Sequence, residues 1–445
     1  MVPPERRAVD GRPPRRGFAR LAAAIAVPVA SVLLAGSVVE TSVAARPLAA
    51  PAAAEPVPLP DPAILTARLK KVSTRNIGKV GLVVTTTDGQ VLAARGADTP
   101  LTPASTMKVL TTMTALDTLG ADKTFATRVV DEGDGRIVLV GGGDPLLTDK
   151  TSTSSYKPAS LQKLAKATVA ALALAGRSRV ALRYDASLFS GPTFSPYWKS
   201  RWLGWEARVA ALEINSGKLS NGRASANPPK TAAHAFARRL KAAGIAVSSI
   251  QPATASAGAT ELARVTSTSL TRIIRRTLLV SDNVAAEVLS RHAAIARGAP
   301  GSFTGAAANV TAWLTARGLW RAGQRILDGS GLAPGSKLTA NGLAGAMRLA
   351  LADPAFGPVL NGLPVAGESG TLKHRFDDPS EKAGRHTVHA KTGTLSGLAA
   401  LAGYLTTADG ALLVFAELGN RASSYYRVYD WLDREAAVVA RCGCR

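Results

Sequence analysis

Three short groups of polar residues in this 445-residue chain have the types and spacing needed for acyl transfer by a serine. The first group pairs Ser105 with Lys108, the second holds Ser281 and Asn283, and the third contains Lys391. Residues i and i+3 share one face of a helix, so the Lys108 amine is within reach of the Ser105 hydroxyl. A serine needs a base before it can attack a carbonyl. A lysine serves as that base only if its pKa falls, and both burial and a second cation such as Lys391 lower it. Ser281 and Asn283 would relay the leaving-group proton and hold the substrate amide.

The residues around Lys391 have the character of a strand that binds the end of a peptide. The backbone N–H groups of Ser105 and Thr394 are predicted to form the oxyanion hole. Gly393 would leave room for a peptide to lie along the strand edge. Lys391, Thr392 and Thr394 would offer a cation and two hydroxyls to a terminal carboxylate.

The Ser-x-x-Lys pattern is not unique, since it also occurs at 154–157 and 160–163, and Ser-x-Asn recurs at 225–227. Those two serines lie in a polar stretch with Pro158 between them. Ser105, in contrast, opens a segment whose apolar residues have helical spacing. The context therefore favours Ser105 as the nucleophile.

The elements that must position these groups are predicted at both ends of the chain. A hairpin turning at Asp88-Gly89 and a helix ending at Gly120 come first. The expected C-terminal elements are strands at 388–394, 399–405 and 411–418 and a helix at about 425–439. Strands from both ends with helices between them predict an α+β fold, in which an antiparallel sheet is covered by helices and the two ends meet in one sheet.

The chain also divides by composition. An Arg-rich start, an apolar run at 21–39 and a small-residue site at 43–45 predict export, by a cleaved signal or an uncleaved anchor. An Ala/Pro-rich linker follows, and short strands with Pro/Ser/Gly-rich connections mark an insertion of one or two small domains. The predicted parts are the signal or anchor (1–45), the linker (46–60), a catalytic domain (61–125 plus 260–445) and the insertion (126–259).

Charge and cysteine usage restrict the function classes. Lys and Arg outnumber Asp and Glu by 54 to 31, but the excess is dispersed, which argues against nucleic acid as a partner. It favours loose association with anionic wall polymers or a membrane surface. Cys442 and Cys444 are the only cysteines, and a Cys-x-Cys bridge is strained and closes almost no loop. Five scattered histidines give no metal-ligand pattern, and no cofactor is expected.

Together the three groups, Ser105-Thr-Met-Lys108, Ser281-Asp-Asn283 and Lys391-Thr-Gly393, are typical of penicillin-binding proteins and serine β-lactamases. Over roughly 64–435 the chain resembles the D-alanyl-D-alanine carboxypeptidase/endopeptidase family, the class C low-molecular-mass penicillin-binding proteins with an inserted domain. Further segments that carry the resemblance are Gly142-Gly-Asp-Pro145, Ala211-Leu-Glu-Ile-Asn215, Asp328-Gly-Ser-Gly-Leu332 and Gly367-Glu-Ser-Gly-Thr-Leu372. The resemblance implies that Ser105 attacks the penultimate D-Ala carbonyl of peptidoglycan stem peptides, expels the terminal D-Ala and passes the acyl group to water. It also implies that β-lactams are covalent inhibitors.

Two alternatives remain open at this point. A serine β-lactamase is disfavoured by the long stretch between Ser105 and Ser281, and by the absence of any Glu between Glu287 and Glu368 to hydrolyse the acyl-enzyme. A non-catalytic wall-binding protein of the same fold is disfavoured because no catalytic side chain is lost. One residue departs from the family pattern, since Ala333 stands where many relatives have Ser. Whether carboxypeptidase or endopeptidase activity dominates is left open.

Overall fold

The computed structural model describes residues 57–204 and 206–443. The predicted signal or anchor (1–45), the linker up to residue 56, and Cys444 lie outside the described residues. Within the described part of the chain, no helix has both the length and the apolar character needed to cross a bilayer.

The first of two sheets is antiparallel and has the strand order β2-β1-β10-β9-β8. Its strands are β1 (Lys79–Thr86), β2 (Val91–Arg95), β8 (Val388–Leu395), β9 (Leu398–Thr406) and β10 (Leu412–Asn420). Strand β1 pairs with β10 over its whole length, from Lys79 opposite Asn420 to Thr86 opposite Leu413. The two ends of the described chain therefore meet in one sheet, and β8 is left as an edge strand.

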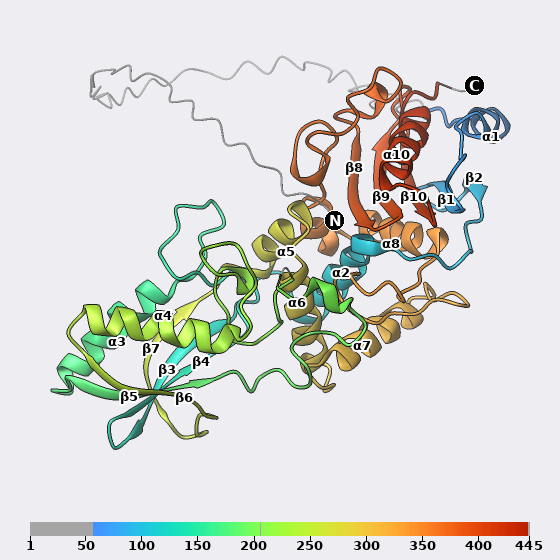
Figure 1. The fold of residues 1–445 in the computed structure, drawn as a ribbon. Coiled ribbons are helices and arrows are strands. Elements are labelled where there is room, and N and C mark those ends of the chain that lie inside the picture. Colours follow the sequence, from blue (N-terminus) through green and yellow to red (C-terminus); the bar gives the residue numbers. More distant parts are fainter. Residues whose placement is uncertain (1–56, 205, 444–445) are drawn as a thin grey trace, which may run out of the picture. The chain divides into compact units, whose positions relative to one another are not determined.

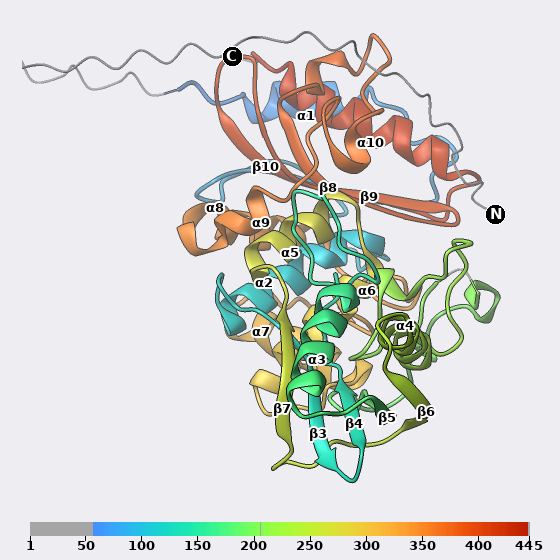
Figure 2. The same cartoon turned by 90° about the vertical axis from the view of Figure 1, so that its left-hand side faces the viewer.

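Helices cover both faces of this sheet (Figure 2). Helices α1 (Pro62–Lys70) and α10 (Tyr425–Ala440) lie on one face, and α8 (Ala340–Ala352) lies on the other. The strand alternation directs successive side chains to these two layers. Phe415 packs in the same core as Trp431 of α10, whereas its neighbours Val414 and Ala416 pack in the core that contains Met347 of α8. The predicted α+β class with an antiparallel sheet covered by helices is confirmed.

Further helices share a core with α8, and two of them carry Lys108 and Asn283. They are α2 (Met107–Leu119), α5 (Leu270–Leu279), α6 (Asn283–Ala296), α7 (Phe303–Ala316) and α9 (Gly357–Leu360). Short 3₁₀ turns occur at Ala104–Thr106, Ser200–Trp202, Asn215–Gly217, Pro354–Phe356, Gly370–Leu372 and Lys382–Gly384.

The second sheet is built from the middle of the chain and has the order β6-β5-β4-β3-β7. Its strands are β3 (Ala126–Gly133), β4 (Arg136–Val140), β5 (Arg179–Asp185), β6 (Ala246–Pro252) and β7 (Thr260–Thr266). Helices α3 (Leu161–Leu174) and α4 (Pro228–Ala242) pack on it with their apolar sides in a shared core. The pairs β4/β5 and β5/β6 are parallel, and each is joined by a crossover that contains one of these helices.

The end of the predicted insertion at residue 259 falls just before the last strand of this sheet. Strand β7 pairs antiparallel with β3, with Ala126 opposite Thr266, and lies beside it in Figure 1. The second sheet therefore takes in residues up to Thr266 before the chain returns to α5.

Candidate active site

Ser105 lies in a tight 3₁₀ turn, Ala104–Thr106, that runs directly into α2. The residue before it, Ala104, adopts a left-handed conformation with φ 47°. Such a conformation costs a non-glycine residue of the order of 1 kcal/mol and is often found at functional sites. Gly331 makes this turn possible, because a Cβ on Gly331 would lie 1.9 Å from the Ala104 carbonyl oxygen. The Ser105 turn thus rests on a neighbouring backbone segment.

Lys108 follows one turn later and is fully buried. Its Nζ donates to three acceptors: Ser105 Oγ at 2.8 Å, Asn283 Oδ1 at 2.7 Å and the Ser330 carbonyl oxygen at 2.8 Å. An ammonium group has three hydrogens, so this set uses all of them. The amine is held at one position, against the hydroxyl of Ser105.

Burial lowers the pKa of Lys108 to about 8, because the charged form loses its hydration. The carboxylates of Asp328, Glu287 and Glu206 oppose this shift. Burial also lowers the pKa of Lys391 well below its usual value, and repulsion from Lys108 lowers it further. Burial is thus the largest cause of the lowered pKa of Lys108, rather than repulsion from a second cation.

The junction between α5 and α6 brings the second group to this amine. Asp282 caps α6 by accepting from Ala285 N at 3.1 Å, and Asn283 is the first helical residue. Asn283 Oδ1 accepts from Lys108, and its Nδ2 donates to Glu206 Oε1 at 3.1 Å. Ser281 is half-buried two residues earlier and has a left-handed φ of 58°.

Strand β8 lies against the Ser105 turn. A Cβ on Gly393 would be 2.5 Å from the Pro103 carbonyl oxygen and 3.0 Å from the Ser105 nitrogen. The glycine is thus required by contact between two parts of the protein, whereas the sequence analysis explained it by room for substrate. Lys391, two residues earlier on the same side of the strand, is fully buried and donates to the Thr392 carbonyl oxygen at 2.8 Å.

The two threonines of β8 have partners within the protein. The Thr392 hydroxyl lies 2.6 Å from the Thr371 hydroxyl. The Thr394 hydroxyl lies 2.5 Å from the hydroxyl of Tyr429, which belongs to α10 on the other face of the sheet. Both hydroxyls, expected to face a substrate carboxylate, are therefore engaged within the protein in this structure.

Sequence reasoning did not identify the residues that hold the loop under Lys108. The buried Asp328 accepts from Gly331 N at 3.0 Å and from Trp198 Nε1 at 2.7 Å. The buried Glu287 accepts from Ser330 N at 2.7 Å. These bonds fix the loop so that the Ser330 carbonyl faces Lys108. The Asp-Gly-Ser-Gly segment is a signal for this role, but the sequence analysis used it only as part of the family resemblance.

Glu206 was also missed, and it comes from the middle of the chain. The sequence analysis expected a site carboxylate only after Ser281, whereas the fold brings Glu206 to Asn283 from upstream. Nothing in the local sequence of Glu206 indicates this contact, since it depends on how residues 206–217 lie against α6.

The competing pattern matches have ordinary structural roles. Ser160 caps α3 by accepting from Lys163 N at 3.3 Å, and Asn227 caps α4. The Ser154 hydroxyl accepts from the nearby Tyr156 N at 3.3 Å. None of these serines has a lysine amine as a hydrogen-bond partner in the part of the chain that the structure describes, unlike Ser105.

The chain is similar to known carboxypeptidases in sequence and to a penicillin-binding protein in fold. The sequence profile of the D-Ala-D-Ala carboxypeptidase 3 (S13) family matches residues 65–221 and 211–434. The chain is 36% identical to carboxypeptidase Rv3627c of Mycobacterium tuberculosis over 86% of this chain and 85% of that protein. It is 35% identical to carboxypeptidase DacB of Mycolicibacterium smegmatis over 96% of each. Its fold is similar to that of penicillin binding protein 4 from Haemophilus influenzae, with a TM-score of 0.70, 20% identity, and coverage of 84% of this chain and 98% of that one.

Proposed function

Since the chain belongs to the D-Ala-D-Ala carboxypeptidase 3 (S13) family, we propose that Ser105 is the residue that carries its acyl-enzyme. The Ser105 Oγ attacks the carbonyl carbon of the penultimate D-Ala of a stem peptide, and the C–N bond to the terminal D-Ala breaks. The hydroxyl proton passes to the Lys108 amine, and the departing amine receives a proton. Water then hydrolyses the ester and frees Ser105.

One observation carries this proposal: the fully buried Lys108 Nζ lies 2.8 Å from Ser105 Oγ and is fixed by Asn283 and the Ser330 carbonyl. With a pKa of about 8, about one tenth of this amine is neutral at pH 7 and able to accept the proton. An exposed lysine would be almost entirely charged there.

The edge position of β8 supports the proposed binding of the substrate. The start of β8 already pairs with residues 364–366, since Val365 lies opposite His389 and Ala390 N donates to the Pro364 carbonyl oxygen at 3.0 Å. A peptide adds to the edge of β8 beyond Ala390 as a further strand, with its terminal carboxylate toward Lys391. The arriving carboxylate favours the charged form of Lys391, which burial otherwise disfavours. The backbone N–H groups of Ser105 and Thr394 form the oxyanion hole, and the absence of a Cβ on Gly393 leaves the two segments in contact. Thr392 and Gly393 complete the binding strand.

Ser281 and Asn283 act on the leaving group in this proposal. Asn283 accepts a hydrogen bond from the Lys108 amine and donates one to Glu206. The amine is thereby held beside the α5–α6 junction, so a proton that it accepts lies next to that junction. The Ser281 hydroxyl then passes that proton to the departing amine.

Penicillins would acylate the same serine, and that reaction tests the assignment. The protein is incubated with a labelled penicillin and the modified peptide is identified by mass spectrometry. Ser105→Ala should abolish labelling, while Ser154→Ala and Ser160→Ala, the other Ser-x-x-Lys matches, should leave it unchanged. Label at either of those serines, or label that persists in Ser105→Ala, would refute the proposal. Rapid turnover of nitrocefin would favour a β-lactamase, and absence of any adduct would favour a wall-binding protein without activity.

The family acts on the cell wall, which supports an extracytoplasmic role. Export through residues 1–45, as a cleaved signal or an anchor, is part of the proposal and is supported by the Arg-rich start and apolar run. The proposed catalytic domain comprises 61–125 plus 260–445, with an insertion at 126–259 whose sheet also includes β7. Mass spectrometry of the N-terminal peptide of the exported protein tests the site of cleavage.

A further inference from the structure

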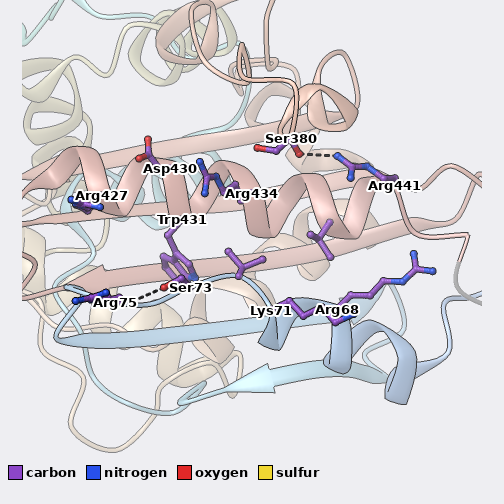
Figure 3. A pocket seen from close by; sticks show the side chains of 12 residues that line it. Arg68, Lys71, Ser73, Arg75, Ser380, Arg427, Asp430, Trp431, Arg434 and Arg441 are labelled. Atoms are coloured by element: carbon purple, nitrogen blue, oxygen red, sulfur yellow. Dashed lines mark hydrogen bonds between the residues drawn. The ribbon is translucent and has the colours of Figure 1, made fainter.

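A cavity of about 610 Å³ lies between α1, the loop that follows it, and α10 (Figure 3). These helices cover the face of the first sheet opposite to α8, so the cavity is separate from the Ser105 site. Six of its lining side chains are cations and one is an acid. The cations are Arg68, Lys71, Arg75, Arg427, Arg434 and Arg441, and the acid is Asp430.

Most of these cations have no carboxylate partner. Arg434 has one, since its Nε lies 3.7 Å from Glu381. Arg441 donates instead to the Ser380 carbonyl oxygen at 2.7 Å. Among residues 57–204 and 206–443, no carboxylate lies within 4 Å of the other four, which are Arg68, Lys71, Arg75 and Arg427. The fold thus gathers like charges that repel one another, and an anion bound among them would relieve that repulsion.

The cations form two walls, and those of one wall are regularly spaced. Arg427, Arg434 and Arg441 follow one another at intervals of seven residues along and just after α10. Seven residues make almost two helical turns, so the three lie on one side of the helix about 10 Å apart, in a row of about 20 Å. The cations at the end of α1 and in the following loop line the other wall (Figure 3). This arrangement suits an elongated ligand with repeated negative charges.

The side chains that line the cavity restrict the class of ligand that it can bind. Five of the six cations are arginines, whose planar fork matches the oxygens of a phosphate group. The only aromatic side chain in the lining, Trp431, is 2% exposed and gives no platform on which nucleic-acid bases could stack. A lipid surface is flat and would meet protruding side chains rather than the walls of a hollow. We infer that this cavity binds a linear polyanion that carries phosphate groups, such as a polyol-phosphate chain of the wall.

The test compares the full-length protein with two double variants that change the net charge equally. Arg75→Gln/Arg427→Gln removes one unpaired cation from each wall. Arg179→Gln/Arg238→Gln removes two exposed arginines, one on β5 and one on α4, and serves as the control. Binding of a short polyphosphate chain is measured by calorimetry, alongside inorganic phosphate and vesicles of phosphatidylglycerol. Labelling by penicillin is measured in every variant to show that the fold is intact.

The expected result is salt-dependent binding of polyphosphate that the cavity variant weakens about tenfold and the control variant leaves within twofold, since each exposed ion pair contributes a few-fold in affinity. Equal losses in both variants would overturn the inference in favour of diffuse charge attraction. Inorganic phosphate that binds as tightly as the chain would also overturn it, as would vesicle binding through Arg75 and Arg427 without polyphosphate binding. If the double variant loses penicillin labelling, the two single variants carry the comparison, with the same outcomes.

Discussion

Replacing Gly393 by alanine adds one methyl group at the contact between β8 and the Ser105 turn. The new Cβ would lie 2.5 Å from the Pro103 carbonyl oxygen and 3.0 Å from the Ser105 nitrogen. Ordinary carbon–oxygen contacts begin at about 3.3 Å, so the two segments must separate by roughly 0.8 Å. A displacement of that size at a reacting group lowers the rate by about 10²-fold. Overpacking of this kind destabilises a protein by about 1–3 kcal/mol, partly offset because alanine is more favourable than glycine in a strand.

The assay is the second-order rate of acylation by a fluorescent penicillin, together with release of D-Ala from a synthetic peptide. Gly357→Ala is the matched control, because a Cβ there has no atom within 4 Å. We expect the control to acylate at the wild-type rate and Gly393→Ala to be slower by one to two orders of magnitude while remaining folded by thermal denaturation. Acylation of folded Gly393→Ala within threefold of wild type would show that the turn does not need this contact, and the reasoning would be wrong.

Three further predictions concern the lysine and its surroundings. Because the pKa of Lys108 is about 8, its neutral fraction, and hence the rate of acylation, should rise about fivefold between pH 7 and pH 8. An acylation rate that does not change with pH, measured by stopped flow, would exclude Lys108 as the base. Glu206→Gln keeps a hydrogen-bond acceptor for Asn283 but removes a negative charge that favours the ammonium form of Lys108. The midpoint of the pH profile of acylation should therefore move to lower pH. A midpoint that stays in place or rises would contradict the contact between Glu206 and Asn283. Trp198→Phe leaves the buried Asp328 without one donor and should lower the free energy of unfolding by about 1–3 kcal/mol in urea denaturation, whereas an unchanged midpoint of denaturation would show that the bond contributes nothing.

Much of the first sheet could be predicted from sequence because its signals are local. The Asp88-Gly89 turn fixes the β1/β2 hairpin, and the continuous apolar run at the start of β10 indicates a strand with two buried faces. The relation between Ser105 and Lys108 is equally local, since one helical turn separates them. Bringing Asn283 to the same amine required the resemblance to a family, because no spacing rule connects α2 with α6.

The rest depends on contacts between segments that are distant in sequence. The parallel pairing of β4 with β5 is set by the crossover through α3, and nothing in either strand marks its direction. The predicted insertion ends at residue 259, just before β7, and only the pairing of β7 with β3 assigns that strand to the second sheet. The basic excess, dispersed along the sequence, is gathered by the fold where α1 meets α10.

The pairing of β1 with β10 determines when the first sheet can form during folding. The first strand that leaves the ribosome has no partner on one side until almost the last residues follow, since Val83 pairs with Ala416. Contacts between such distant segments make folding slow, because closing the long intervening loop costs entropy before the contacts can form. Strand β8, which lies against the Ser105 turn, is joined to this sheet only through β9 and β10. A chain that stops before β10 should therefore remain unable to bind penicillin, and the full-length chain should gain that ability only late in its folding.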